Sequence, residues 1–297
     1  MDEASNKKRI IIVTGASGVV GQEYVEYFSQ QPHTTCVAVS RRDLEYQCEN
    51  TTSVIVDLLH KQEVERAFGS LNFSEIDEVV FIHPVGKFKY EENGIPEIDI
   101  DGDGIDDDIY KTNVETFTNV LRVLLPNIEK ERQNGRDVHL ALCGLGSISD
   151  KYQVTYWSSY TKAKDVLRSI VYTLVQERSE YVRGLFVNVS TVDTKNENEL
   201  RSSADKSYWL EADELVRSSI PFLLHEIAGS WKQVDIFRES PYFREGYYED
   251  WALVRKVWQE QMKKSGQKDS TREGGGSESK KGPKTDIIER NDGDPIG

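Results

Sequence analysis

Tyr160 and Lys164 are the two residues whose types and spacing most directly suggest chemistry. They lie four positions apart in SSYTKAKDVLRSIV, a spacing that puts both side chains on one face of a helix. Because an ammonium near a phenol favours the phenolate, we expect Lys164 to lower the pKa of Tyr160. Such a tyrosine exchanges a proton with a carbonyl or alcohol oxygen. The alternative is an amphipathic helix with a packed tyrosine and a solvated lysine.

Two polar residues upstream extend this candidate site. Ser147 lies thirteen residues before Tyr160, just past a strand-like run, and its hydroxyl is a candidate donor to the same substrate oxygen. Asn113 opens a helix-like stretch and is a candidate holder of a water that relays protons to Lys164. The four residues together make a chance Tyr-x-x-x-Lys match a poor explanation.

A glycine-rich turn near the N-terminus predicts phosphate binding. The segment IIIVTGASGVVGQEY sits where a first strand passes into a first helix. Glycines there allow positive φ and close approach of backbone N–H groups to a pyrophosphate, and the helix N-terminus adds its dipole. The predicted dinucleotide turn comprises Gly15, Ser17, Gly18, Val20 and Gly21. A tight turn without a ligand is the alternative.

The residues after the second and third strands bear on which dinucleotide binds. The second strand ends in Ser40, Arg41 and Arg42, where an acidic residue would favour NAD and a basic one accommodates a 2′-phosphate. We therefore predict NADP(H). Asp57, followed by Leu58, stands where a carboxylate would contact the adenine, although a helix N-terminal aspartate is nearly as good an explanation.

Apolar runs alternating with helical patterns supply the elements that must position these residues. We expect strands over 8–13, 35–40, 53–56, 78–82, 137–143, 184–189 and 233–237, and helices over 22–30, 61–68, 112–130, 158–177 and 212–228. This alternation predicts an α/β fold: a Rossmann-like, doubly wound parallel sheet flanked by helices, in a single domain over 1–261. An aromatic stretch over 242–258 predicts a further helix. The polar segment 262–297 is predicted to be a disordered tail, with the apolar pair Ile287–Ile288 as an island that could dock.

Composition narrows the possible partners. The chain has 297 residues, a net charge of −14 and three cysteines. A negative surface repels phosphate backbones, so we expect no nucleic-acid partner. The sequence shows neither a signal-peptide pattern nor an apolar run long enough to span a membrane, so we expect a cytoplasmic protein without a membrane partner.

The acidic stretch DIDGDGIDDDIY over 99–110 partly matches a calcium loop. Asp99, Asp101 and Asp103 alternate around Gly104, but Tyr110 replaces the final bidentate glutamate. The alternative is an acidic loop that leads into a helix N-terminus.

Taken together, TGASGVVG, Asp57, Asn113, Ser147 and the Tyr160/Lys164 pair resemble the short-chain dehydrogenase/reductase family over roughly residues 8–240. The resemblance implies that Tyr160 is the acid/base and that Lys164 binds the nicotinamide ribose. It also implies that Ser147 positions the substrate and that Asn113 supports a proton relay.

Other residues of the resemblance are less regular. The glycine spacing and His83 in FIHPVG are similar to the extended, sugar-nucleotide branch of the family, whereas the Ser–Tyr spacing resembles the single-domain type. The resemblance implies that His83 and Thr194 contact the cofactor, that about 194–212 is a substrate lid, and that the chain forms a homodimer or homotetramer.

The predicted function is therefore hydride transfer between NADP(H) and a small carbonyl or alcohol substrate. Two alternatives stay open: a non-catalytic NADP-binding sensor or scaffold, and an epimerase or dehydratase of sugar-nucleotide type.

Overall fold

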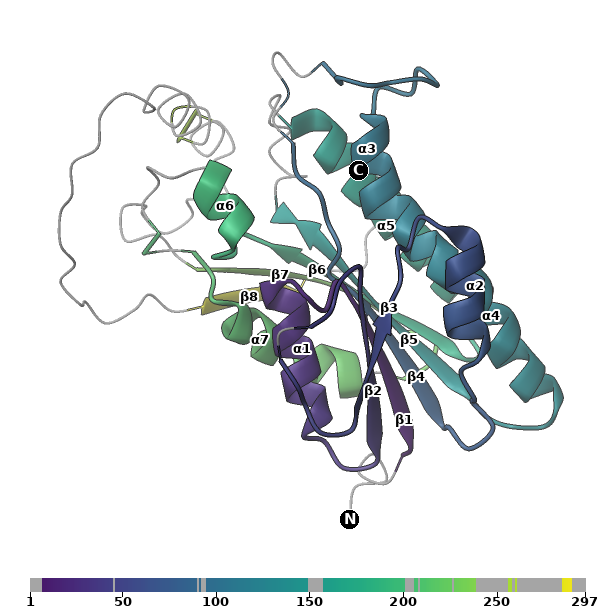
Figure 1. Cartoon of the computed structure of the whole chain (residues 1–297). Coiled ribbons are helices and arrows are strands. Elements are labelled where there is room, and N and C mark those ends of the chain that lie inside the picture. The colour runs from purple at the N-terminus through teal and green to yellow at the C-terminus, as the bar shows by residue number, and fades with distance from the viewer. Residues whose placement is uncertain are drawn as a thin grey trace.

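One mostly parallel sheet with helices on both faces forms the part of the chain that the structure describes (Figure 1). The computed structural model describes residues 7–44, 46–89, 91, 95–148, 157–200, 206–207, 209–225, 227–238, 256–257, 260 and 285–289. The strand order is β3-β2-β1-β4-β5-β6-β7-β8. Pairing is parallel from β3 to β7, and β8 is antiparallel to β7. The predicted doubly wound α/β fold is confirmed.

All the predicted strands occur, with ends shifted by a few residues. Their bounds are β1 Arg9–Thr14, β2 Thr34–Ser40, β3 Thr51–Ile55, β4 Glu78–His83, β5 His139–Ser147, β6 Val182–Val189 and β7 Trp231–Arg238. The sequence suggested that Ser147 lies just past the fifth strand, but it is the last residue of β5. Its backbone is held by the pairing of β5 with β6, where Ser147 lies opposite Val189.

The helices follow the predicted pattern, with some additional short elements and shifted ends. Their bounds are α1 Val19–Ser29, α2 Lys61–Gly69, α3 Asp107–Tyr110, the π-helical segment η3 Lys111–Glu115, α4 Thr116–Gln133, α5 Ser158–Glu177, α6 Lys195–Leu200 and α7 Ala212–His225. The helix expected over 112–130 is broken at its start by η3, and α6 lies within the predicted lid. The expected helix over 242–258 lies almost wholly outside the described residues. No helix in the described part of the chain combines the length and apolar character that crossing a membrane requires.

Both faces of the sheet are buried. Alternate residues of β1 point to opposite sides: Ile10 and Ile12 pack with α2, α4 and α5, whereas Ile11 and Val13 pack with α1 and α7. This two-sided burial explains why the strands read as continuous apolar runs rather than as alternating patterns. The same layering leaves the carboxyl ends of the strands to form the functional surface.

The structure differs from the expected disordered tail at residues 285–289. This segment, TDIIE, forms β8 and adds to the free edge of β7, with Ile287 opposite Ile236. A strand edge offers unpaired N–H and C=O groups, and β-branched residues favour a pleated conformation. The apolar island noted in the sequence is therefore the part of the tail that docks. The rest of 262–297 lies outside the described residues.

Candidate active site

A first cavity of about 280 Å³ lies where the strand order reverses between β1 and β4. Ligands of doubly wound sheets bind at this point, outside the carboxyl ends of the strands. Its walls come from the segments that follow β1, β2, β3 and β4 and from the start of the η3–α4 helix. The lining residues are Gly15, Ser17, Gly18, Val39, Ser40, Arg41, Val56, Asp57, Leu58, Leu59, Pro84, Val85, Gly86, Thr112 and Thr116. Half of the predicted cofactor residues are thus brought together: Gly15, Ser17, Gly18, Ser40, Arg41, Asp57 and Leu58.

The glycine turn has the close packing that its sequence implies. Gly15 has a positive φ of 62°, and a Cβ there would lie 3.1 Å from the Val85 side chain. Gly18 is the N-cap of α1. Gly21 lies beneath the turn rather than in the cavity wall, because a Cβ on it would stand 2.3 Å from the Gly15 carbonyl oxygen. Two of these glycines therefore shape the turn and the third permits its contact with the helix.

Ser40, Arg41 and Arg42, which we expect to determine the preference for NADP over NAD, lie at or beside this cavity. Arg41 lines it, and Arg42 is exposed beside it. Neither guanidinium has an ion-pair partner within the described ranges. The Ser40 hydroxyl donates to the Arg42 carbonyl, which fixes the turn that carries both arginines. Asp57 lines the cavity and accepts from the Leu59 N–H at 3.0 Å, so it also serves as a local turn cap.

A second cleft of about 490 Å³ continues from the first, with which it shares Pro84 and Gly86. Its lining residues are Val20, Pro84, Gly86, Lys87, Phe88, Leu145, Gly146, Ser147, Trp157, Tyr160, Lys164, Val189, Ser190, Thr191, Val192, Thr194, Glu197 and Leu215. The predicted residues Ser147, Tyr160, Lys164 and Thr194 all belong to this wall. The volume lies in the range of pockets that hold small molecules.

The electrostatics of the Tyr160/Lys164 pair differ from the expectation. Burial, and secondarily the Glu197 carboxylate, raise the pKa of the Tyr160 phenol, whereas a lowered value was predicted. Lys164 explains the difference, because burial lowers its own pKa to about 7 and so weakens it as a positive charge. Its Nζ lies 5.6 Å from the centre of the Tyr160 ring. The Tyr160 phenol is therefore protonated, the form that donates to a carbonyl oxygen.

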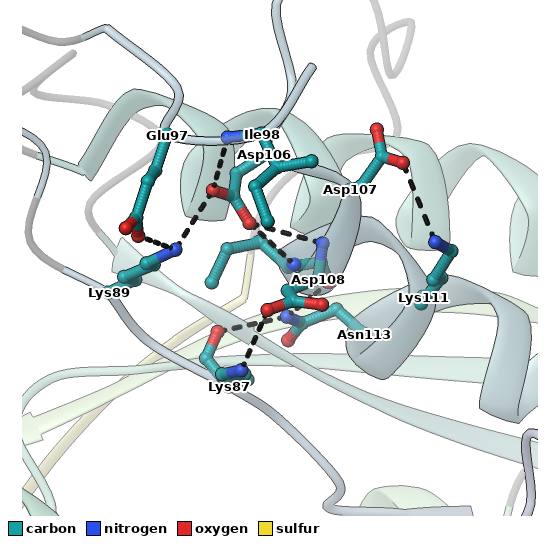
Figure 2. Close-up of polar contacts among 10 residues, drawn as sticks. Lys87, Lys89, Glu97, Ile98, Asp106, Asp107, Asp108, Lys111 and Asn113 are labelled. Atoms are coloured by element: carbon teal, nitrogen blue, oxygen red, sulfur yellow. Dashed lines mark hydrogen bonds and ion pairs between the residues drawn. The ribbon is translucent and has the colours of Figure 1, made fainter. Parts of the chain in front are cut away.

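Asn113 lies behind this pair, in the π-helical segment. Its Nδ2 donates to the carbonyls of Ile109 at 2.8 Å and Lys87 at 2.9 Å, the second of which is drawn in Figure 2. Its buried Oδ1 has no partner in the described part of the chain. A Cβ on Gly86 would stand 3.2 Å from both Asn113 Oδ1 and Lys164 Nζ. Glycine at position 86 therefore leaves a small polar space between the two groups.

His83 does not reach either cavity wall. It is completely buried at the end of β4, where Nδ1 meets the Thr14 hydroxyl at 2.8 Å and Nε2 meets the Thr116 hydroxyl at 3.2 Å. Burial, and then the Lys164 charge, hold the pKa of His83 well below its usual range. Thr116 donates to the Thr112 carbonyl at 2.6 Å, so Nε2 carries the proton that Thr116 accepts. The residue ties β1, β4 and α4 together beneath the cofactor cavity.

The predicted lid is anchored at both ends. Thr194 caps the start of α6 through a bond from the Glu197 N–H at 3.3 Å, and Glu197 also lines the cleft. At the other end Leu210 is buried and bridges to Val192. Trp209 is 1% exposed and packs in the interior rather than lining the cleft. Residues 201–205 and 208, including Tyr208, lie outside the described part.

The acidic loop groups a different set of carboxylates from the one expected. Asp99, Asp101 and Asp107 each bring one oxygen within 4.8 Å of the others, and Asp103 is not among them. Backbone N–H groups already engage them: Asp99 accepts from Gly102 at 2.8 Å and Asp107 accepts from Ile100 at 3.2 Å. The loop therefore has the self-capping character of the alternative interpretation, and calcium binding stays a prediction.

Several cleft residues were missed from the sequence, among them Gly86, Phe88 and Glu197. Gly86 lies three residues after the end of the buried strand β4, in a loop where close backbone approach is common, and this signal was available. Phe88 and Glu197 carried no local signal, because an aromatic in a loop and an acid in a polar stretch are ordinary surface residues.

Comparison with known proteins agrees with this geometry. The profile of a family described as short chain dehydrogenase matches residues 9–205. None of the curated proteins matches the sequence. Among solved structures, ligand-free aldohexose dehydrogenase of Thermoplasma acidophilum is 16% identical, with a TM-score of 0.62 over 77% of this chain and 93% of that one. A Burkholderia cenocepacia short chain dehydrogenase in complex with NADP is 14% identical, with a TM-score of 0.61 over 87% and 98%. The 3-ketoacyl-(acyl-carrier-protein) reductase of Brucella melitensis, complexed with NADH, is 17% identical, with a TM-score of 0.58 over 77% and 97%. At sequence identities of 14–17%, these solved structures show that the fold is shared.

Proposed function

Because this chain belongs to the short-chain dehydrogenase family, we propose that it transfers a hydride between NADP(H) and a small carbonyl or alcohol substrate. Family membership supports the broader class, an NAD(P)-dependent oxidoreductase. The finer proposal depends on one observation: Ser147, Tyr160 and Lys164 line a cleft that is continuous with the glycine-lined cavity.

The residues present fit a dinucleotide phosphate. The space beside Gly15 and Gly86 is of the kind that a side-chain Cβ would fill, as the contacts of 3.1 and 3.2 Å indicate. The N-terminus of α1 faces the cavity through Gly18 and favours an anion. Arg41 and Arg42 are the groups that would hold a 2′-phosphate, since Arg forms paired hydrogen bonds with phosphate oxygens. Lys164 would hold the nicotinamide ribose.

The side chains of the cleft supply the proton chemistry, and NADPH when bound supplies the hydride. In the direction of reduction, the protonated Tyr160 phenol donates to the substrate carbonyl oxygen, and the Ser147 hydroxyl donates a hydrogen bond to the same oxygen. Lys164, with a pKa near 7, then returns a proton to the tyrosine. A water held between Asn113 Oδ1 and Lys164 Nζ would relay a proton from bulk solvent to the lysine and would give the buried amide oxygen a partner.

Tyr160→Phe tests this proposal and separates it from a non-catalytic sensor. We expect the variant to bind NADPH as the wild type does and to lose at least about 100-fold in kcat on any substrate found in a screen of carbonyls and alcohols, since proton transfer contributes about that much. NADPH oxidation in proportion to product separates hydride transfer from an epimerase or dehydratase. Turnover that survives the substitution unchanged would mean that the mechanism is wrong.

The resemblance and the sequence also support a cytoplasmic protein that assembles as a homodimer or homotetramer, without nucleic-acid or membrane partners. Light scattering on the purified full chain measures the assembly, and a monomeric mass would contradict that part of the proposal.

A further inference from the structure

Described residues of the connection between β4 and α3 contact the first turn of α5, which begins at Ser158, two residues before Tyr160. We call residues 84–106 the β4–α3 connection; of these, 90 and 92–94 lie outside the described residues. Phe88 of the connection packs edge-to-face on the Tyr160 ring, with centroids 5.4 Å apart. Ile105 is buried in a small cluster against which Tyr160 also packs. The connection therefore touches the ring of the candidate acid through Phe88 and contributes Ile105 to the cluster on which Tyr160 packs.

The first turn of α5 needs a cap that its own sequence does not supply. The first N–H groups of a helix have no partner within the helix. The N-cap position holds Trp157, which makes no side-chain capping bond. Glu91 of the connection takes this role, because its Oε2 accepts from the Ser159 N–H at 3.1 Å. Glu91 is 3% exposed, and its charge is favourable beside a helix N-terminus.

Two further bonds hold the same turn to the connection. The Asp106 N–H donates to the Ser159 hydroxyl at 2.8 Å, in a buried position. The Lys162 ammonium donates to the Gly104 carbonyl at 2.8 Å. Ser159 and Lys162 flank Tyr160 in the helix, so the main chain of the tyrosine is fastened on both sides.

Asp106 is in turn held in place by a network of bonds around its buried carboxylate. Its carboxylate has no exposed surface and accepts from the Lys89 ammonium at 3.1 Å and the Ile98 N–H at 3.3 Å. Lys89 also pairs with Glu97, as Figure 2 shows. Burial opposes ionisation here, but the hydrogen bonds from Lys89 and the backbone hold the pKa of Asp106 below its usual range. Because the Asp106 carboxylate is charged and hydrogen-bonded, moving it would break several bonds at once, so it holds this part of the connection in place.

We propose that the β4–α3 connection positions Tyr160, with Glu91 as a cap supplied from a distant segment, Asp106 as the buried anchor and Lys89 as the residue that holds Asp106. This inference rests on the proposed function for its effect on turnover, but its structural part can be measured without a substrate. None of the three residues lines either cavity, so each is a positioning residue rather than a catalytic one.

The experiment compares four variants of the full chain: Glu91→Ala, Glu91→Gln, Lys89→Met and, as the control, Lys111→Met. Gln keeps a carbonyl oxygen for the Ser159 N–H. Lys111 makes an ion pair with Asp107 at 3.5 Å in the same acidic region, and Figure 2 draws this pair beside the network. The measurements are kcat, the NADPH dissociation constant by fluorescence, and hydrogen–deuterium exchange of the peptide that covers 158–164.

We expect Glu91→Ala to lower kcat at least about tenfold, because small misplacements of a reacting group are costly, while the NADPH dissociation constant changes less than about twofold. Its 158–164 amides should exchange faster than in the wild type. Glu91→Gln should recover kcat to within about threefold of the wild type, Lys89→Met should fall between the two Glu91 variants, and Lys111→Met should match the wild type.

Wild-type exchange at 158–164 in Glu91→Ala would overturn the proposal, as would faster exchange spread equally over the whole sheet. Failure of Glu91→Gln to recover either measurement would also count against the capping role. If the wild type turns over no carbonyl or alcohol, the proposed function fails, and the exchange data alone decide whether the connection holds this turn.

Discussion

Replacing Gly21 with alanine sets two effects of opposite sign against each other. Gly21 lies in α1, and alanine is more favourable than glycine in a helix by about 1 kcal/mol. A Cβ at this position, however, would stand 2.3 Å from the Gly15 carbonyl oxygen, 2.8 Å from its carbon and 3.0 Å from the Ala16 Cα. All three are backbone atoms, so the clash is relieved only if the turn moves away from the helix.

We expect the clash to outweigh the helix propensity. Carbon–oxygen contacts are comfortable at about 3.3 Å, so the Gly15 peptide must move by about 1 Å. Overpacking costs about 1–3 kcal/mol, and a backbone shift belongs at the upper end, which leaves a net loss of about 2 kcal/mol in unfolding free energy. Since the moved peptide forms the cofactor cavity, NADPH affinity should fall at least about tenfold.

Two other glycines provide controls for this prediction. A Cβ on Gly69, at the end of α2, meets nothing within 4 Å, so Gly69→Ala should raise the unfolding free energy by up to about 1 kcal/mol. A Cβ on Gly18 would lie 3.3 Å from the Gly15 oxygen, so Gly18→Ala should fall between the other two. Urea unfolding and NADPH fluorescence titration measure both quantities. If Gly21→Ala is as stable as Gly69→Ala and binds NADPH normally, the close approach of turn and helix does not exist.

Three further predictions concern charge. Changing Arg41 and Arg42 together to Ala should weaken NADPH binding by about 10–100-fold and NADH binding by less than about twofold, since hydrogen bonds to charged groups contribute about 1.5–3 kcal/mol; equal effects on the two would contradict the NADP assignment. Burial lowers the pKa of Lys164 from 10.5 to about 7, so the unfolded chain holds the proton that the folded one has released, and wild-type stability should rise as pH increases from about 7 to about 9. Above about pH 9 the Cys36 and Cys143 thiols act in the opposite direction, because burial raises their pKa from 9.0 to about 12. In urea titrations the unfolding free energy of Lys164→Met should stay constant between about pH 7 and 9 and should exceed that of the wild type below pH 7; a parallel rise in both proteins would refute this. Finally, Glu78→Ala should lower the unfolding free energy by about 3–5 kcal/mol, because it leaves the Arg183 guanidinium buried without its carboxylate partner at the start of β6. Arg183 and Arg9 hold the pKa of Glu78 low against the effect of burial. The stabilisation from Glu78 should therefore fade as pH falls, which thermal unfolding would detect.

The sequence by itself determined the sheet, the glycine turn and the tyrosine–lysine pair. Continuous apolar strands such as that around Ile11 are buried wherever a parallel sheet has helices on both faces, so local pattern and tertiary outcome agree. The same holds for Gly15 and for the i,i+4 spacing of Tyr160 and Lys164, because their geometry follows from backbone conformation alone.

Only the tertiary structure decided the properties that depend on burial and on distant segments. The sequence predicted a lowered pKa for Tyr160, but burial reverses the direction and also weakens the charge of Lys164. His83 looked like a cofactor residue and is instead enclosed beneath the cavity. The cap on α5 comes from Glu91, 68 residues away along the chain. Desolvation and long-range hydrogen bonds are set by which segments the fold brings together, and no local pattern of residues encodes them.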